Sequence, residues 1–470
     1  MIKIDDLIAR LGDIPMITGE KAVKAKSRDF FWYSPILKEK LDHITSDLVV
    51  VPRSETDVVT VLAACYDLDI PVTPRGGGTG NYGQAMPLAG GVVMDMTRMN
   101  AIKELRDGVA VVEPGVLMGE IDKAAHEALG QELRIHPSTL ETASIGGFVA
   151  GGSGGVGSIR WGMLAETGNI LRLRLATMEA KPQLIDLTGP AINHVHHAYG
   201  VTGIITEIDM PLTAAPDWVD MLVSFPSWED ALNAGWQIAG TEGLWLKLLS
   251  AVEVPAPENY FKRHARFLQQ GEHVLCIMVA PNSADALEGM AQELGGRIAM
   301  HSGKLGSEDL KGLPHMYHLG WNHTTLRGLR IEPEITYLQI GFPDGHEIET
   351  CEEISTRYKG EIIGHVEFTR GNGAKRASGL PLVRYRSAER LMALIKELEA
   401  MGCPVWNPHV YTLEEGNRRD ADPDQLAMKK ANDPKGLLNP GKMIAWDRSD
   451  YTYDPDHTYT YPDLQSRGRT

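Results

Sequence analysis

The sequence predicts an α+β protein with two domains, and three observations support this. The chain has 470 residues, of which 43% are hydrophobic and 23% charged, a globular composition long enough for two or three domains. Residues 1–212 mix short β-rich runs with helices and carry two glycine-rich segments. Residues 213–420 alternate strands and helices around few glycines, which predicts a separate α/β or α+β domain.

Local signals predict the elements of the first domain in order. Residues 47–76 predict a strand, then a helix capped by Ser54, then a second strand. Residues 90–116 predict a series of short strands with a turn at Asp107-Gly108. Residues 117–130 predict an amphipathic helix that ends at Gly130.

The second domain and the C-terminal region have their own patterns. Residues 273–280 and 335–342 predict strands, and residues 387–402 predict a helix. Residues 447–470 are polar, rich in Tyr, Asp and Pro, and lack any periodic pattern. Such a composition predicts a loosely ordered surface arm.

Charge and cysteine usage exclude several classes of function. The net charge of -16 disfavours binding to nucleic acid and to anionic membrane surfaces. No run of ~18 uncharged apolar residues is present, so we expect no membrane span. The four cysteines are far apart, which excludes an iron–sulfur cluster within the chain and is typical of a reducing cytoplasm.

The segment "VTPRGGGTGNYGQAMP", residues 72–87, has five glycines in eight positions. It contains a G-x-G-x-x-G string, but a dinucleotide fingerprint needs a helix next, and Pro87 and a second strand follow instead. No G-K-[ST] closes the loop, so it is not a Walker A motif. The remaining physical interpretation is a nest of backbone N–H groups around an anion, with Arg75 beside it.

A second glycine-rich segment lies about 70 residues later. Seven glycines fall between Gly146 and Gly157, interleaved with the small residues Ser144, Ala150 and Ser153. Small residues are needed wherever a planar ring or a diphosphate approaches the backbone closely. Together the two segments predict one large ligand held from both sides.

These segments resemble those of a known family, the FAD-binding oxidoreductases of the vanillyl-alcohol-oxidase and p-cresol-methylhydroxylase (PCMH) type. Within it the chain is most similar to the glycolate oxidase subunit and D-lactate dehydrogenase group. The resemblance rests on "PRGGGTGNYG", "VEPGV", "HPSTLETASIGGFVAGGSGGVGSIRWG", "YGVTGIITEIDMPL" and "DPKGLLNPGKM", in the order of the family. It implies a two-subdomain PCMH-type FAD-binding domain (1–212), an α+β substrate-cap domain (213–420) and a segment returning to the FAD domain (421–446).

The resemblance also implies which residues bind FAD. The diphosphate is expected to lie against the loop residues Pro74, Arg75, Gly76, Gly77, Gly78, Thr79, Gly80 and Asn81. The flavin is expected to lie against Pro137, Ser138, Ser144, Gly146, Gly147, Ala150, Ser153 and Gly154. Gly203 and Ile205 are expected near the adenine, and Asn439 is expected to close over the ring system. Covalent members carry a histidine where this chain has Thr79, so we expect non-covalent FAD.

Bound FAD accepts a hydride, so the protein needs a group that takes the hydroxyl proton of the substrate. Suitable groups gather in "WNHTT" (321–325), "GHVEFTRGNG" (364–373) and "NPHVY" (407–411). The resemblance matches His409 to the catalytic base of D-2-hydroxyacid members and His365 to a metal-binding histidine. The remaining candidates are His323, Tyr411 and Arg370, and each of the five residues has the alternative of a purely structural role.

We expect no metal ion. Asn372 lies near where the family has its second metal histidine, and Pro408 stands in place of the ligand glutamate. A single histidine cannot form a selective metal site. The histidines of "NHVHHAYG", residues 193–200, lack opposing ligands and predict an exposed loop.

The substrate stays open between a 2-hydroxy acid and an alcohol. Hydroxyacid members clamp the carboxylate with arginine and lysine, whereas this chain has Trp321 and Asn322 in that stretch and Gln339 downstream. Arg327 or Arg370 could replace the clamp; alternatively, the substrate is a secondary or benzylic alcohol without a carboxylate.

Two further alternatives remain. One is a vanillyl-alcohol-type phenolic oxidase that uses Tyr411 and Arg370 to stabilise a phenolate. The other is a non-catalytic FAD subunit that transfers electrons within a larger complex. The sequence leaves the electron acceptor unidentified, and a homodimer is compatible with it.

Overall fold

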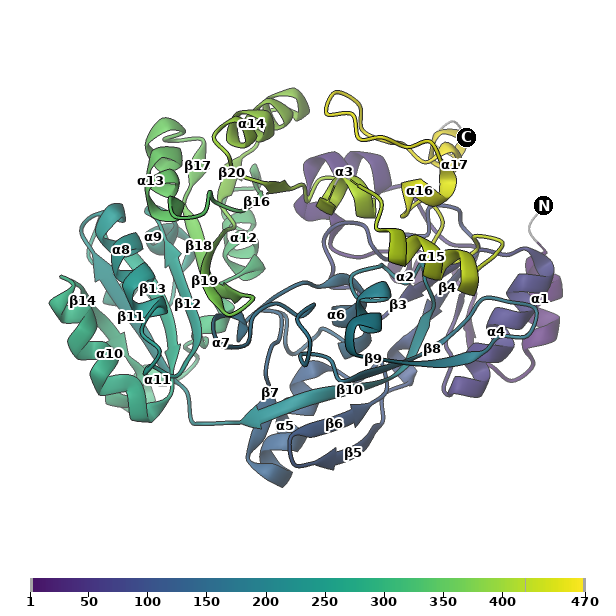
Figure 1. The fold of residues 1–470 in the computed structure, drawn as a ribbon, viewed down its shortest axis with the longest axis horizontal. Helices are drawn as coiled ribbons and strands as arrows, with labels where there is room; N and C mark the ends of the chain where they lie inside the picture. The colour runs from purple at the N-terminus through teal and green to yellow at the C-terminus, as the bar shows by residue number, and fades with distance from the viewer. Residues whose placement is uncertain (1–2, 419, 468–470) are drawn as a thin grey trace.

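The computed structural model describes residues 3–418 and 420–467. Figure 1 shows two lobes: sheets from the first half of the chain form one, and the green sheet with helices α8, α10 and α13 forms the other. The yellow C-terminal helices lie with the first lobe. A bridge between Val72 and Leu438 joins the C-terminal segment to that lobe.

The first lobe begins with a small mixed sheet, in the order β1-β2-β4-β3. Strands β2, β4 and β3 are parallel; helix α4 connects β2 to β3, and the glycine-rich loop connects β3 to β4. Helix α4 packs against helix α1, and apolar side chains of both helices join those of the sheet in one buried core. The bounds are β1 (Met16–Ile17), β2 (Leu48–Val50), β3 (Val72–Arg75), β4 (Val92–Asp95), α1 (Ile4–Leu11) and α4 (Glu55–Leu68).

A second, antiparallel sheet completes this lobe in the order β5-β6-β10-β8-β9, with β7 beside β10. Helix α5 packs against β7 and β5, and its apolar residues share a core with this sheet. The bounds are β5 (Ile102–Arg106), β6 (Val109–Val112), β7 (Gln131–Leu133), β8 (Arg172–Ala176), β9 (Leu184–Thr188), β10 (Ile204–Ala214) and α5 (Met118–Leu129).

The second lobe, here called the cap, is an antiparallel sheet in the order β14-β11-β13-β12-β18-β19-β16-β21, with a three-stranded sheet β15-β20-β17 beside it. The strands are β11 (Val219–Phe225), β12 (Leu246–Val252), β13 (His273–Val279), β14 (Arg297–His301), β15 (Ile335–Tyr337), β16 (Gln339–Ile340), β17 (Ile362–Ile363), β18 (His365–Gly371), β19 (Ala374–Gly379), β20 (Leu382–Arg384) and β21 (Val405–Trp406).

Helices cover the cap sheet and fill the remaining connections. Those of the cap are α8 (Trp228–Ala239), α9 (Ala256–Tyr260), α10 (Pro281–Glu293), α11 (Ser307–Leu310), α12 (Asn322–Leu329), α13 (Glu347–Arg357) and α14 (Ala388–Ala400). The others are α2 (Glu20–Lys26), α3 (Pro35–Leu41), α6 (Ile145–Gly151), α7 (Ser158–Trp161), α15 (Pro423–Asn432), α16 (Ile444–Asp447) and α17 (Pro462–Arg467). Across the described residues, none of the helices combines the length and apolar character that crossing a membrane requires.

Several local predictions are confirmed. The Ser54 side chain accepts a hydrogen bond from the backbone N–H of Asp57 and caps α4. Gly130 ends α5 in the left-handed conformation that glycine favours. The mixed helix and sheet architecture is the α+β class that the sequence predicts. The domain boundaries themselves stay a prediction.

Two predictions need correction. Residues 335–342 do not form one strand: β15 and β16 belong to different sheets, and the chain passes between them at the fully buried Leu338. The C-terminal arm is not loose throughout, because Leu464 packs into a buried cluster with Phe31, Leu37 and Leu41. The scattered apolar residues of the arm gave no periodic signal from which this packing could be predicted.

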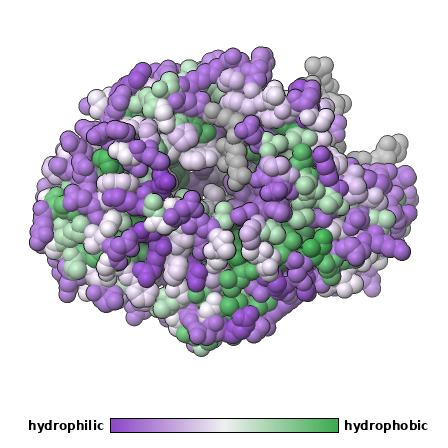
Figure 2. All heavy atoms as spheres, viewed as in Figure 1, coloured by the Kyte–Doolittle hydropathy of each residue, from purple (hydrophilic) through white to green (hydrophobic). Residues whose placement is uncertain are grey.

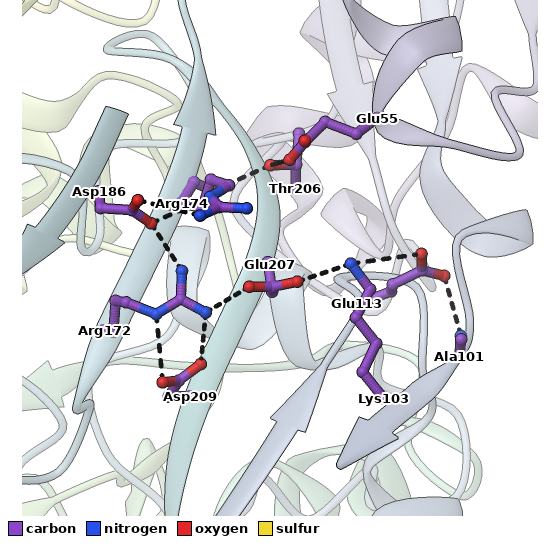
Figure 3. A network of polar contacts seen from close by, with 10 residues as sticks. All are labelled: Glu55, Ala101, Lys103, Glu113, Arg172, Arg174, Asp186, Thr206, Glu207 and Asp209. Atoms are coloured by element: carbon purple, nitrogen blue, oxygen red, sulfur yellow. Dashed lines mark hydrogen bonds and ion pairs between the residues drawn. The ribbon is translucent and has the colours of Figure 1, made fainter. Parts of the chain in front are cut away.

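A network of charged side chains ties together four strands of the second sheet (Figure 3). The Arg172 guanidinium on β8 contacts Asp209 and Glu207 of β10, and Asp186 of β9 at 2.6 Å. Lys103 of β5 reaches Glu207 at 2.6 Å from the other side. The pairs between β8, β9 and β10 join neighbouring strands and stabilise their register, and the Lys103–Glu207 pair reaches across β6.

We expect Arg172→Ala to lower the free energy of unfolding by about 2 kcal/mol, because Glu207 and Asp209 are then left without their main partner. The matched control is Arg10→Ala, since the Arg10–Asp67 pair is half exposed and worth little. Urea unfolding followed by circular dichroism measures both changes. Equal midpoints for the two variants would contradict a structural role for the network.

Candidate active site

A cavity of about 490 Å³ lies where the two lobes meet, lined by both glycine-rich segments and by residues of the cap. A hollow is visible near the centre of the face shown in Figure 2. One wall comes from the loop after β3 and from α6 with its flanking turns. The opposite wall comes from the start of α12, from β16, and from the turns after β19 and β21.

The two glycine-rich segments touch each other, which explains why they contain glycine. A Cβ added to Gly76 would lie 2.0 Å from the Ser144 Oγ, and one added to Gly77 would lie 2.3 Å from the carbonyl oxygen of Thr142. The Ser144 hydroxyl accepts a hydrogen bond from the backbone N–H of Gly77 at 3.1 Å. The cradle is therefore a fixed structure built from both segments.

The loop also offers hydrogen-bond donors to a ligand. Within the part of the chain that the structure describes, the backbone N–H groups of residues 78–81 donate to no other group, and these residues line the cavity. Neighbouring N–H groups of this kind form an anion-binding nest. The donor set fits the diphosphate of a dinucleotide.

Arg75 is the one Lys or Arg side chain among the described residues that line the cavity. Its guanidinium donates to the backbone carbonyls of Arg28 and Gly76 and so braces the loop. Burial lowers its pKa, while Asp95 and Asp29 nearby oppose that effect. The side chain adds positive charge at the diphosphate end of the cavity.

The structure gathers every sequence-predicted cofactor residue except Asn439 around this cavity. The Asn439 side chain instead donates to the backbone carbonyls of Gln84 and Tyr199. It therefore stabilises the first glycine-rich segment without lining the cavity. The loop of residues 193–200 is not exposed as predicted, because His196 is buried, lines the cavity and contacts the Gly152 carbonyl.

None of the five predicted catalytic residues lines the cavity, although Asn407, Pro408 and Val410 do. The His409 Nε2 donates to the backbone carbonyl of Tyr337 at 2.9 Å, and its Nδ1 faces the Ser34 hydroxyl at 2.8 Å. Burial lowers the pKa of His409 to about 4. With both nitrogens engaged away from the cavity, His409 is not placed to take a proton from a substrate.

The other four candidates also have structural partners. His365 pairs with Glu367, and Arg370 donates to the Ile159 carbonyl and contacts Glu242. His323 stacks on His318, and burial lowers its pKa to about 3. The Tyr411 hydroxyl accepts from the backbone N–H of Tyr461, and burial raises its pKa to about 12.

The cap end of the cavity presents uncharged polar groups instead. Tyr82, Asn322, Gln339, Ser378 and Asn407 all line it. The Gln339 Nε2 donates to the Tyr82 hydroxyl oxygen. Burial raises the pKa of Tyr82, and its polar contacts with Gln339, Tyr337 and Asn322 act in the opposite direction. Tyr82 is therefore a neutral phenol whose oxygen accepts from Gln339.

Sequence reasoning missed Tyr82 as a site residue. The available signal was its position, because it is the only large side chain in "GGGTGNYG", a run otherwise made of residues that permit close approach. For Gln339 the sequence indicates only that it lies where the resemblance leads one to expect a lysine.

We expect the buried histidines to make stability depend on pH. Folded pKa values near 3 or 4 for His136, His264 and His409 lie below the unfolded value of about 6.5, so the unfolded chain binds more protons in that interval. Stability is then full above pH 6.5 and falls as the pH drops toward 4, by about 3 kcal/mol for His409 alone. Thermal unfolding from pH 7 to 4 measures this, and a shallower slope in His409→Gln confirms the share of His409. Unfolding midpoints that stay constant to pH 4 would contradict it.

Comparisons with known proteins agree with the site geometry. Residues 46–182 match the family described as "FAD binding domain". The chain is 27% identical over 438 residues to the glycolate oxidase subunit GlcD of Escherichia coli (strain K12), covering 84% of this chain and 83% of that protein. It is 26% identical over 429 residues to the D-lactate dehydrogenase of Archaeoglobus fulgidus, covering 84% and 91%.

The fold is also known from solved structures. An alkyldihydroxyacetonephosphate synthase structure superimposes with a TM-score of 0.70 at 16% sequence identity, covering 92% of this chain and 85% of the other. Together with the cradle described above, the comparisons define an FAD-binding fold of the PCMH type. The chain is an FAD-dependent oxidoreductase, as its sequence resemblance predicts.

Proposed function

We propose that this flavoprotein oxidises a CH–OH donor, either a small hydroxy acid or a secondary or benzylic alcohol, to the carbonyl compound. Bound FAD supplies the acceptor for the hydride, so the C–H bond breaks with its electron pair, the hydroxyl proton is released to water, and the C=O bond forms. The printed names of the relatives, glycolate oxidase and D-lactate dehydrogenase, support a CH–OH donor.

One observation carries the proposal: the cavity runs without interruption from the diphosphate cradle to a wall of hydrogen-bonding groups on the cap. At this end of the cavity Tyr82 of the first lobe and Gln339 of the cap hold a substrate hydroxyl, with the Tyr82 O–H donating to its oxygen.

We also propose that FAD is bound without a covalent bond, because the loop position used by covalent relatives is Thr79, whose side chain cannot form that link. The protein is proposed to reside in the cytoplasm, which is supported by four cysteines that are all free and buried. The phenolic-oxidase alternative loses support, since neither Tyr411 nor Arg370 lines the cavity.

The test is anaerobic mixing of the FAD-loaded protein with glycolate, D-lactate, L-lactate, benzyl alcohol and 1-phenylethanol, while the flavin absorbance is followed. We expect at least one CH–OH compound to bleach the flavin, and dithionite to bleach it as a control. Bleaching by dithionite but by none of the donors would contradict the proposal and favour an electron-transfer subunit.

A further inference from the structure

A buried carboxylate in the cap has no part in the function described so far. Glu367 lies on β18 and is 1% exposed. Its Oε2 accepts from the Ser250 hydroxyl of β12 at 2.5 Å, and its Oε1 contacts His365 Nε2 at 2.8 Å. A carboxylate in the interior is costly unless all its oxygens are paired, so its retention in the cap core requires a reason.

The third partner of Glu367 is the backbone of a cavity residue. The Trp321 N–H donates to the Glu367 Oε1 at 2.6 Å. Trp321 has φ 50° and ψ −142°, a conformation that a bulky residue adopts only when its surroundings impose it. Gly320 allows this approach, because a Cβ there would lie 3.1 Å from the Glu367 Oε1.

With this backbone conformation, the indole ring of Trp321 lies against the first lobe. Trp321 lines the cavity, and a Cβ on Gly154 of the second glycine-rich segment would lie 3.3 Å from the Trp321 Cη2. The next residue, Asn322, also lines the cavity, and its side chain helps to lower the pKa of Tyr82. The backbone conformation of Trp321 therefore determines where the cap wall of the cavity contacts the second glycine-rich segment.

We propose that Glu367 is a positioning residue: it holds Trp321 in its positive-φ conformation and thereby fixes the indole against Gly154 of the second glycine-rich segment. Ser250 and His365 orient the carboxylate from the two paired strands β12 and β18. The rigid cap sheet is in this way connected to the wall that a substrate meets. The link to substrate fit rests on the proposed function, whereas the link to the flavin rests on FAD binding alone.

The test uses the fluorescence of bound FAD, because an indole close to a flavin quenches its emission. We expect Trp321→Phe to raise emission about threefold, and Glu367→Ala to raise it similarly in the wild-type background but not in the Trp321→Phe background. Glu367→Gln should stay near wild type, since its amide oxygen still accepts the Trp321 N–H. Glu361→Ala is the matched control, as Glu361 is a buried cap carboxylate that pairs with Arg390.

Wild-type emission in Glu367→Ala, or an equal increase in both backgrounds, would overturn the proposal. If Glu367→Ala does not fold, Glu367→Asp replaces it, because the shorter side chain cannot reach the Trp321 N–H. With a donor from the anaerobic panel, we further expect Glu367→Ala to raise KM about tenfold while Glu367→Gln does not. If the panel yields no substrate, the proposed function fails, whereas the fluorescence cycle still decides the role of Glu367.

Discussion

Gly77→Ala is expected to yield protein that binds FAD at least about 100-fold more weakly than the wild type. A methyl group at this position would lie 2.3 Å from the carbonyl oxygen of Thr142, so the two glycine-rich segments would have to separate. Such overpacking costs about 1–3 kcal/mol, and the displaced loop would also lose the geometry of its N–H groups. Flavin absorbance per chain after gel filtration measures the loss.

The control for that variant is Gly289→Ala on α10, where an added Cβ meets nothing within 4 Å. This variant is expected to keep its FAD and to unfold at the wild-type temperature or slightly above, because Ala favours helix over Gly. Stoichiometric FAD in Gly77→Ala would show that the contact between the two segments is not needed for the cradle.

Tyr82→Phe is expected to retain FAD but to be reduced by the CH–OH donor about 100-fold more slowly. The change removes the hydroxyl that accepts from Gln339 and that we propose donates to the substrate oxygen, without altering the shape of the loop. Stopped-flow measurement of flavin bleaching under anaerobic conditions gives the rate.

Tyr411→Phe is the matched control, because the Tyr411 hydroxyl accepts from the Tyr461 N–H and Tyr411 is not among the residues that line the cavity. Its reduction rate should remain close to that of the wild type. The opposite pattern, a slow Tyr411→Phe and a fast Tyr82→Phe, would contradict the role proposed for Tyr82 and favour Tyr411, one of the candidates predicted from the sequence.

The cofactor side of the site was predictable because close approach leaves a direct trace in the sequence. Where the chain must approach another segment closely, glycine fits best: Gly77 lies against the backbone carbonyl of Thr142, and Gly76 lies against the side chain of Ser144. The residues predicted to hold FAD therefore gather around one cavity, apart from Asn439, which supports the loop from behind.

The catalytic side was not predictable, because it depends on contacts between residues far apart in the chain. The position of His409 follows from its contacts with Ser34, 375 residues earlier, and with the Tyr337 carbonyl. The resemblance to the family predicted that His409 lies near the flavin. The spacing of residues along the sequence does not show whether the side chain points into the cavity or into the buried core. Likewise, nothing local shows that Gln339 of the cap reaches Tyr82 of the first lobe.

The most direct test of the account is whether the purified protein carries one FAD per chain and releases it on denaturation. We predict that acid precipitation leaves FAD in the supernatant in a 1:1 ratio to the chain, as expected for a cradle of backbone N–H groups with Thr79 in place of a covalent histidine. Flavin that remains with the precipitated polypeptide, or a chain that binds no FAD at all, would contradict it.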